Sequence, residues 1–308
     1  MSTVIGVEET PIPEILRLEK SADAMGSTWS IILYGDGWAR MEAAMDAAFG
    51  ELCRLDAMLS HRRPSSEWCE LNRHAGERAV KVSPELFRLI SACLQYHRLS
   101  DGAFDISVGP LMKAWGFVRG SGRRPEPADL EAALACTGSQ HIRTDAAAQT
   151  IRFDRAGVEI DAGGIGKGYA VDRMAEVLRR EEFYSALVTA SGSSIYGLGA
   201  PPTKPDGWRI EVLDPRQGHG NATEVLLKDM SISTSGSSQK HFWADGRIYP
   251  HILDPRTGYP VQGMLSVSVI APRAMDSEAW SKPCFIHGRE WAAKHLPEGF
   301  RALFFEGE

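Results

Sequence analysis

The residues best suited to chemistry lie in one glycine-rich stretch, Asp161-Ala-Gly-Gly-Ile-Gly-Lys-Gly-Tyr-Ala-Val-Asp-Arg173. A short strand-like run, Gly157-Val-Glu-Ile160, precedes it, and apolar residues recur at helical spacing from Tyr169 to Arg180. Glycines let the backbone approach a ligand closely, and the free N–H groups of a helix start attract anions. Because Lys167 adds a positive charge there, we expect a phosphate cradle between a strand and a helix. A tight turn without a ligand is the alternative.

Two familiar glycine motifs do not fit this stretch. The P-loop requires Ser or Thr after its lysine, whereas Gly168 follows Lys167. The dinucleotide fingerprint requires the spacing G-x-G-x-x-G, whereas Gly164, Gly166 and Gly168 are evenly spaced. The stretch therefore predicts an anion site of another kind.

A second candidate is the segment His251-Ile-Leu-Asp-Pro-Arg-Thr-Gly-Tyr-Pro260. It combines a histidine, an aspartate, an arginine and a threonine with two prolines and a glycine, which is typical of a rigid site loop. A lone histidine is usually structural. His251 ends an expected strand and shares a turn with Asp254, which favours a role as base or ligand.

Three other stretches allow both a structural and a functional interpretation. Asp105 lies between apolar neighbours and either caps a turn or accepts hydrogen bonds from a ligand's ring or ribose; the residues alone favour the cap. Met25, beside Gly26, is either a plain strand start, which is favoured, or an apolar contact for a flat ring. The hydroxyl cluster Ser231–Ser238 is either a polar turn or a set of groups that faces phosphate oxygens.

Composition limits the class of protein. The chain has 308 residues, 43% hydrophobic and 24% charged, which suits one large domain or two intertwined lobes. Its net charge of −6, without a long basic run, argues against nucleic acid as the main partner. The five scattered cysteines, without a C-x-x-C pair, fit reduced thiols in a cytoplasm. Residues 1–20 do not resemble a signal peptide and no apolar run could span a membrane, so we expect a cytoplasmic protein unless a leader was trimmed.

The elements that position these residues can be outlined from periodicity. We expect helices at 41–59, 84–99, 126–136 and 276–288, and strands at 185–189, 208–213, 222–227 and 265–271. We also expect a hairpin in 243–249, a second hairpin that pairs 149–153 with 157–160, and a small-residue turn at 190–199. This alternation is compatible with an α+β fold but does not select it over α/β.

Taken in order, several of these stretches resemble the ApbE family of FAD:protein FMN transferases, over about residues 22 to 290. The motifs that carry the resemblance are Met25-Gly26-Ser27, Ala103-Phe104-Asp105, Val108-Gly109-Pro110, Trp115-Gly116-Phe117, Asp161 to Asp172, Thr234-Ser235-Gly236 and His251 to Pro260. The resemblance implies an α+β fold of mixed, largely antiparallel sheets with surrounding helices and a flavin groove between lobes. It implies an N-terminal extension at 1–20 and one domain of two intertwined lobes at 21–308.

The resemblance also implies a reaction. Such enzymes bind FAD and Mg²⁺, cleave the pyrophosphate, and pass FMN to a Thr or Ser of a target flavoprotein with release of AMP. Two alternatives stay open: a related protein that binds FAD without transferring it, and an FAD pyrophosphatase that uses water as acceptor.

Roles for individual residues follow from the same resemblance. His251 is the implied base for the acceptor hydroxyl, and Lys167 holds the pyrophosphate. The implied FAD contacts are Met25, Ala103, Phe104, Asp105, Asp161, Lys167, Thr234, Ser235, Gly236, His251 and Asp254.

The implied metal site departs from the family pattern. The Gly164 carbonyl falls at a metal-ligand position, but the helix that should supply Asp and Thr reads Glu278-Ala-Trp-Ser-Lys-Pro283. Glu278 can still ligate Mg²⁺, although it is one methylene longer. Lys282 cannot ligate while charged, and could instead place its ammonium where the metal would be and pair with Glu278. Pro283 removes a helix N–H, and Asp276 is a less favoured ligand in an alternative register.

Overall fold

A computed structural model describes residues 15–118, 120, 122–216, 222–237, 241–244 and 246–307. Ser238 of the hydroxyl cluster, Asp245 of the expected hairpin turn and the first fourteen residues of the expected N-terminal extension lie outside the described residues.

A seven-stranded sheet forms the centre of the fold, with every neighbouring pair of strands antiparallel. Its order is β1 (Leu16–Ala24), β2 (Ser27–Gly35), β6 (Ala186–Ala190), β7 (Ser194–Leu198), β10 (Met230–Gly236), β13 (Met264–Ala271) and β14 (Arg301–Glu306). Together with the helices described below, this confirms the expected mixed fold with antiparallel sheets. β1 contains residues 16–20, which we expected to precede the domain.

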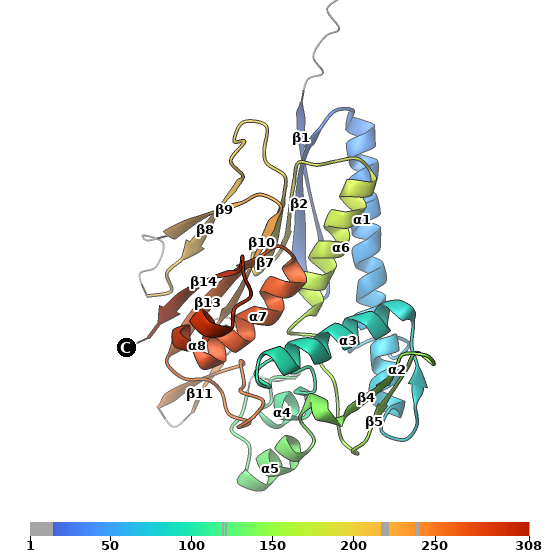
Figure 1. Cartoon of the computed structure of the whole chain (residues 1–308), viewed down its shortest axis with the longest axis vertical. Coiled ribbons are helices and arrows are strands. Elements are labelled where there is room, and N and C mark those ends of the chain that lie inside the picture. The colour runs from blue at the N-terminus through green and yellow to red at the C-terminus, as the bar shows by residue number, and fades with distance from the viewer. Residues whose placement is uncertain are drawn as a thin grey trace, which may run out of the picture.

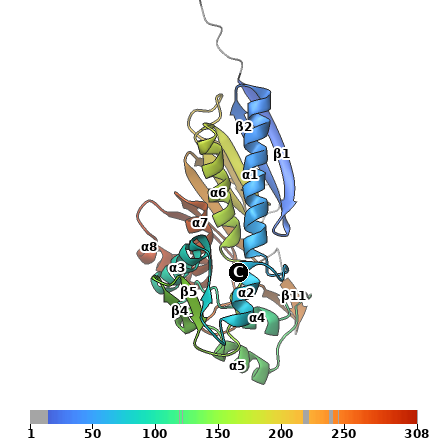
Figure 2. The same cartoon turned by 90° about the vertical axis from the view of Figure 1, so that its right-hand side faces the viewer.

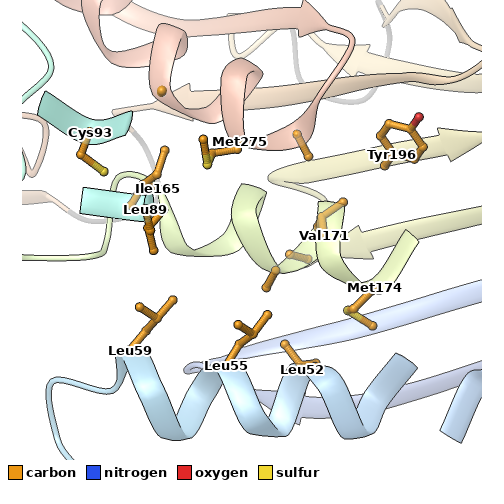
Figure 3. Close-up of a cluster of buried hydrophobic side chains, with 14 of the residues drawn as sticks. Leu52, Leu55, Leu59, Leu89, Cys93, Ile165, Val171, Met174, Tyr196 and Met275 are labelled. Carbon is orange, nitrogen blue, oxygen red and sulfur yellow. The ribbon is translucent and has the colours of Figure 1, made fainter. Parts of the chain in front are cut away.

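Three long helices pack on one face of this sheet: α1 (Trp38–Leu59), α6 (Gly166–Arg180) and α7 (Ala274–His287) (Figure 1). The side chains of Leu52, Leu55 and Leu59 on α1 point toward α6 (Figure 3). These leucines recur three or four residues apart, as a helix face requires, and burying each one contributes about 1.5–3 kcal/mol. Hydrophobic packing therefore fixes α6 between α1 and α7.

The other face of the sheet is covered by a hairpin of β8 (Trp208–Leu213) and β9 (Ala222–Leu227). Trp208 and Leu227 from this hairpin pack with Ile232 of β10 in a separate apolar cluster. Successive side chains of a strand point to opposite faces, so the serines on either side of Ile232 point toward the helices.

The serines of β10 make a hydroxyl ladder with α7. Ser231 and Ser233 lie 3.0 and 2.8 Å from the Ser277 hydroxyl, and the Ser235 hydroxyl lies 2.7 Å from that of Ser281. The interpretation of this cluster as a polar turn is wrong, because it forms a central strand. Small hydroxyls let α7 approach the sheet closely while satisfying their own hydrogen bonds.

Most of the remaining elements lie together at the end of the fold where α6 begins, and α8 directly follows α7 (Figures 1 and 2). The helices are α2 (Glu67–His74), α3 (Pro84–Leu99), α4 (Gly109–Ala114), α5 (Pro127–Ala135) and α8 (Arg289–His295). The strands are β3 (Val80–Lys81), β4 (Ile142–Asp145), β5 (Thr150–Phe153), β11 (His241–Ala244) and β12 (Arg247–Pro250). Among the described helices, none has the length and apolar character that crossing a membrane requires.

The expected hairpin of 149–153 with 157–160 is wrong. β5 pairs with β3 and β4, and residues 157–160 form no strand. Side chains of α2 satisfy this backbone instead: the Ile160 N–H donates to Asn72 Oδ1 at 2.8 Å, and the Ile160 carbonyl accepts from Asn72 Nδ2 at 2.9 Å and Trp68 Nε1 at 3.1 Å. The glycine stretch therefore begins from an irregular segment that α2 holds in place.

Helix predictions were more accurate. The 84–99 helix matches α3, because Ser83 caps it by accepting from the Leu86 N–H and Pro84 occupies its first turn. α1 begins three residues before the predicted start, and α7 continues through Pro283 to His287. The predicted 190–199 turn is wrong over its second half, which is β7.

Candidate active site

The glycine stretch forms the start of α6, at the crossing with α7. A Cβ added to Gly168 would lie 2.2 Å from the Ala274 carbonyl oxygen and 3.0 Å from Glu278 Cβ, so only glycine fits. Ile165, just before the helix, packs close to Leu89 of α3 (Figure 3). Packing from two helices therefore holds the first turn of α6, which carries Lys167.

The two crossing helices cap each other. The Gly168 N–H of α6 donates to Glu278 Oε2 of α7 at 2.6 Å. In return, Asp172 of α6 accepts from the Ala274 and Met275 N–H groups of α7 at 2.6 and 2.9 Å. Each carboxylate faces the positive end of the other helix, which stabilises its charge. Burial nevertheless raises the pKa of Asp172 to about 7.

A lysine occupies the space beside this crossing. Lys282 Nζ donates to the Glu278 carbonyl oxygen at 3.0 Å and lies 3.8 Å from Glu278 Oε1. Burial lowers the pKa of Lys282 to about 8; the negative charge of Glu278 opposes that shift and the positive charge of Lys167 reinforces it. Two ammonium groups and one buried carboxylate thus share the start of α6.

Gly164 and Phe104 complete this cluster. A Cβ placed on Gly164 would lie 3.6 Å from Lys282 Cε and 3.7 Å from the Phe104 ring. Met25 reaches the same helix start from the turn between β1 and β2, since its methyl carbon lies 3.2 Å from the Cβ position of Gly166. The structure therefore brings together Met25, Phe104, Gly164, Lys167, Glu278 and Lys282. Met25 lies in a turn at φ 51° and not at a strand start, which corrects the favoured interpretation.

Asp161 and Asp105 lie on either side of the same turn. The Asp161 N–H donates to the Ile106 carbonyl at 2.6 Å, and Asp161 Oδ1 accepts from the Gly163 N–H at 2.6 Å. This carboxylate therefore shapes the glycine turn, and its side chain is partly exposed. Ala103, two residues before Asp105, is buried.

The Asp105 carboxylate has protein partners on all sides. It accepts from the N–H groups of Ser107 and Ser139 at 2.7 and 2.8 Å and lies 2.9 Å from His97 Nδ1. Burial would raise the pKa of Asp105, but His97 holds it below its usual value. For His97, burial acts to lower the pKa, and the bond to Asp105 outweighs it, so the pKa is raised. These contacts agree with the cap that the residues alone favour.

The second candidate segment directly follows β12. The His251 ring packs edge-on to Phe117, with ring centroids 6.4 Å apart. Asp254 pairs with Arg256 at 2.7 Å; burial would raise the pKa of Asp254, but Arg256 holds it below its usual value. Arg256 Cγ lies 3.7 Å from the Cβ position of Gly102. The segment therefore lies against the loop that carries Ala103, Phe104 and Asp105.

Thr234, Ser235 and Gly236 lie near the end of β10. The Thr234 hydroxyl lies 2.7 Å from that of Ser268, and Ser235 bonds Ser281, the residue before Lys282. Both hydroxyls thus serve the packing of the sheet, and Gly236 is partly exposed. Their expected contacts with FAD stay predictions.

The sequence assigned no role to Asp172, His97 or Ser281, although Asp172 caps α7, His97 pairs with Asp105 and Ser281 bonds Ser235. The partners of Asp172 are 102 and 103 residues away along the chain, and such contacts leave no trace in local spacing. The only available signal was the position of Asp172 within the glycine motif.

The residues present do not fit the Mg²⁺ that the resemblance implies. Glu278 directs one carboxylate oxygen to the Gly168 N–H and the other toward the Lys282 ammonium. Asp276, the alternative ligand, bonds Arg273 at 2.7 Å and the Tyr96 hydroxyl. Within the described residues, no group of three or more His, Cys, Asp and Glu side chains could hold a metal ion.

Known proteins resemble this chain over most of its length. A sequence model of the ApbE family matches residues 25–304. The chain is 32% identical over 288 residues to an FAD:protein FMN transferase of Klebsiella pneumoniae, covering 92% of this chain and 87% of that protein. It is 33% identical over 282 residues to one of Treponema pallidum, covering 86% and 78%.

Solved structures give the same result. The ApbE protein of Thermotoga maritima matches with a TM-score of 0.86 and 32% identity, covering 94% of both chains. The flavinyl transferase ApbE of Pseudomonas stutzeri matches with a TM-score of 0.83 and 31% identity, covering 96% of this chain and 92% of that one. The chain belongs to the ApbE family.

Proposed function

We propose that this chain is an FAD:protein FMN transferase, which attaches FMN from FAD to a Thr or Ser of a flavoprotein. The observation that carries the proposal is the pair of ammonium groups, Lys167 and Lys282, at the N-terminal end of α6. The chain is acidic overall, with a net charge of −6, so an anionic ligand needs a local positive site such as this one. The names of its relatives support FAD as that ligand.

The proposed reaction is a phosphoryl transfer, in which positioning and charge neutralisation do most of the catalysis. Lys167 and the start of α6 hold the FAD pyrophosphate, and Lys282 adds charge beside it. The acceptor hydroxyl oxygen forms a bond to the phosphorus of the FMN half. The pyrophosphate P–O bond breaks, its electron pair leaves with AMP, and His251 takes the hydroxyl proton.

Other contacts complete the proposed site. Met25, which is partly exposed, offers an apolar contact for a flat ring close to the start of α6, and the buried Phe104 ring lies near Gly164 and stays a proposed contact. Ala103, Asp105, Asp161 and Asp254 in the surrounding loops, and Thr234, Ser235 and Gly236 at the end of β10, stay proposed FAD contacts. The acceptor is a flavoprotein that exposes a Thr or Ser.

The test is to incubate the protein with FAD and a flavoprotein acceptor that carries a target threonine. Intact mass of the acceptor and release of AMP are followed together, for the wild type and for His251→Ala. We expect a mass gain of one FMN group that His251→Ala abolishes while FAD binding persists. AMP and free FMN without labelling would favour hydrolysis, and bound FAD with neither product would favour a flavin-binding protein.

We also propose a cytoplasmic location. All five cysteines are free thiols in the structure, as suits a reducing compartment. Cell fractionation of the native protein tests this, and recovery outside the cytoplasmic fraction would contradict it.

A further inference from the structure

The amino group of Lys282 lies where α7 passes the glycine stretch. Its Nζ bonds the Glu278 carbonyl oxygen at 3.0 Å, which also accepts from the Ser281 hydroxyl at 2.8 Å. Its Cε lies 3.6 Å from the Cβ position of Gly164. The Lys282 ammonium therefore lies beside both Glu278 and Gly164 of the glycine stretch.

The Glu278 carboxylate is buried, with 2% of the residue exposed, and both of its oxygens are engaged. Oε2 accepts the Gly168 N–H at 2.6 Å, and Oε1 faces the Lys282 ammonium at 3.8 Å. The carboxylate charge is thus balanced by the start of α6 on one side and by an ammonium on the other.

A divalent cation has no place in this arrangement. Magnesium requires about six oxygen ligands near 2.1 Å in octahedral geometry. The neighbours of Lys282 along the helix are Ser281, which bonds Ser235, and Pro283, so neither adds a carboxylate. The ammonium would also repel a second cation placed beside Glu278.

We infer that the Lys282 ammonium takes the place of a divalent cation, so that the flavin pyrophosphate binds at this site without magnesium. The identity of the anion rests on the proposed function, whereas the exclusion of magnesium rests on Lys282 and Glu278 alone. The two parts are tested separately.

The first experiment titrates MgCl₂ into the FAD-free protein by isothermal calorimetry. We expect no saturable binding to the wild type, and binding of one ion to a Glu278→Asp/Lys282→Thr double variant. Lys20→Thr is the matched control, because Lys20 pairs with Asp46 on the surface of α1. One saturable magnesium ion bound by the wild type would overturn the inference, whether or not the double variant folds.

The second experiment measures FAD affinity by flavin fluorescence in EDTA and in magnesium. The wild type should have the same Kd in both. Lys282→Met should weaken binding in EDTA by about tenfold to a hundredfold, as expected for loss of one charge-assisted hydrogen bond, whereas Lys282→Arg should retain most of the affinity.

The outcomes separate the two proposals. A wild-type Kd that improves about tenfold or more with magnesium would overturn the inference and leave the transferase function standing. If the wild type binds no FAD in either buffer, the proposed function fails. In that case, a wild type that binds no magnesium in the calorimetry still supports the exclusion of magnesium by Lys282.

Discussion

Replacing Gly168 by alanine tests the crossing of α6 and α7 most sharply. The new methyl carbon would lie 2.2 Å from the Ala274 carbonyl oxygen, so the two helix starts must separate by about 1 Å. Overpacking of this kind costs about 1–3 kcal/mol, and weakening the Gly168–Glu278 hydrogen bond costs about 1.5–3 kcal/mol. Alanine favours a helix over glycine by only about 1 kcal/mol, so we expect a net loss of about 1.5–5 kcal/mol in the free energy of unfolding.

Gly50→Ala provides the matched control. Gly50 lies within α1, is exposed, and has no atom within 4 Å of its Cβ position. The same substitution there should stabilise the protein by about 0.5–1 kcal/mol. Urea unfolding measures both variants, and FAD titration should show weaker binding for Gly168→Ala alone. Equal stability of the two variants would refute the proposed crossing.

Three further predictions concern the groups that position the site. Asp172→Ala leaves two N–H groups at the start of α7 without an acceptor, and urea unfolding should show a loss of about 1–3 kcal/mol. The raised pKa of His97 makes its bond with Asp105 stabilising below the unfolded pKa of about 6.5, and that stability is lost as pH rises through the folded pKa. Because the pKa of Asp105 is lowered, its carboxylate stabilises the fold above the unfolded pKa of about 3.8, and this stability is lost as pH falls through the folded pKa. The stability advantage of wild type over His97→Gln should therefore be greatest between about pH 3.8 and pH 6.5 and shrink on either side. An advantage that does not change with pH would contradict the pairing. Lys167→Ala should weaken FAD binding by about tenfold or more in a fluorescence titration, and unchanged binding would remove Lys167 from the site.

Local signals in the sequence predict the long elements well. Ser83 and Pro84 mark the start of α3 correctly, and the apolar face of α1 matches the packed leucines. The glycine stretch predicts a helix start beside Lys167, which the structure confirms, although α6 begins at Gly166, three residues before the predicted helical run. In each case a few neighbouring residues determine the conformation, so that pattern alone is informative.

Contacts between distant segments escaped prediction. Residues 157–160 have the composition of a strand, but the backbone of Ile160 bonds to the side chains of Asn72 and Trp68. The serines of β10 have the composition of a turn, and their hydrogen-bond partners lie far away in the sequence, on α7. The capping of α6 by Glu278 joins residues 110 apart. Such choices depend on which surface packs against the segment, and local spacing does not encode that.

The most direct test of the central claim is the intact mass of an acceptor flavoprotein after incubation with this protein and FAD. A second acceptor, in which valine replaces the target threonine, keeps the shape of the side chain but removes the hydroxyl that must attack phosphorus. The account predicts a mass gain of one FMN group on the first acceptor only, with one AMP released for each FMN attached. Labelling of both acceptors, or of neither, would contradict it.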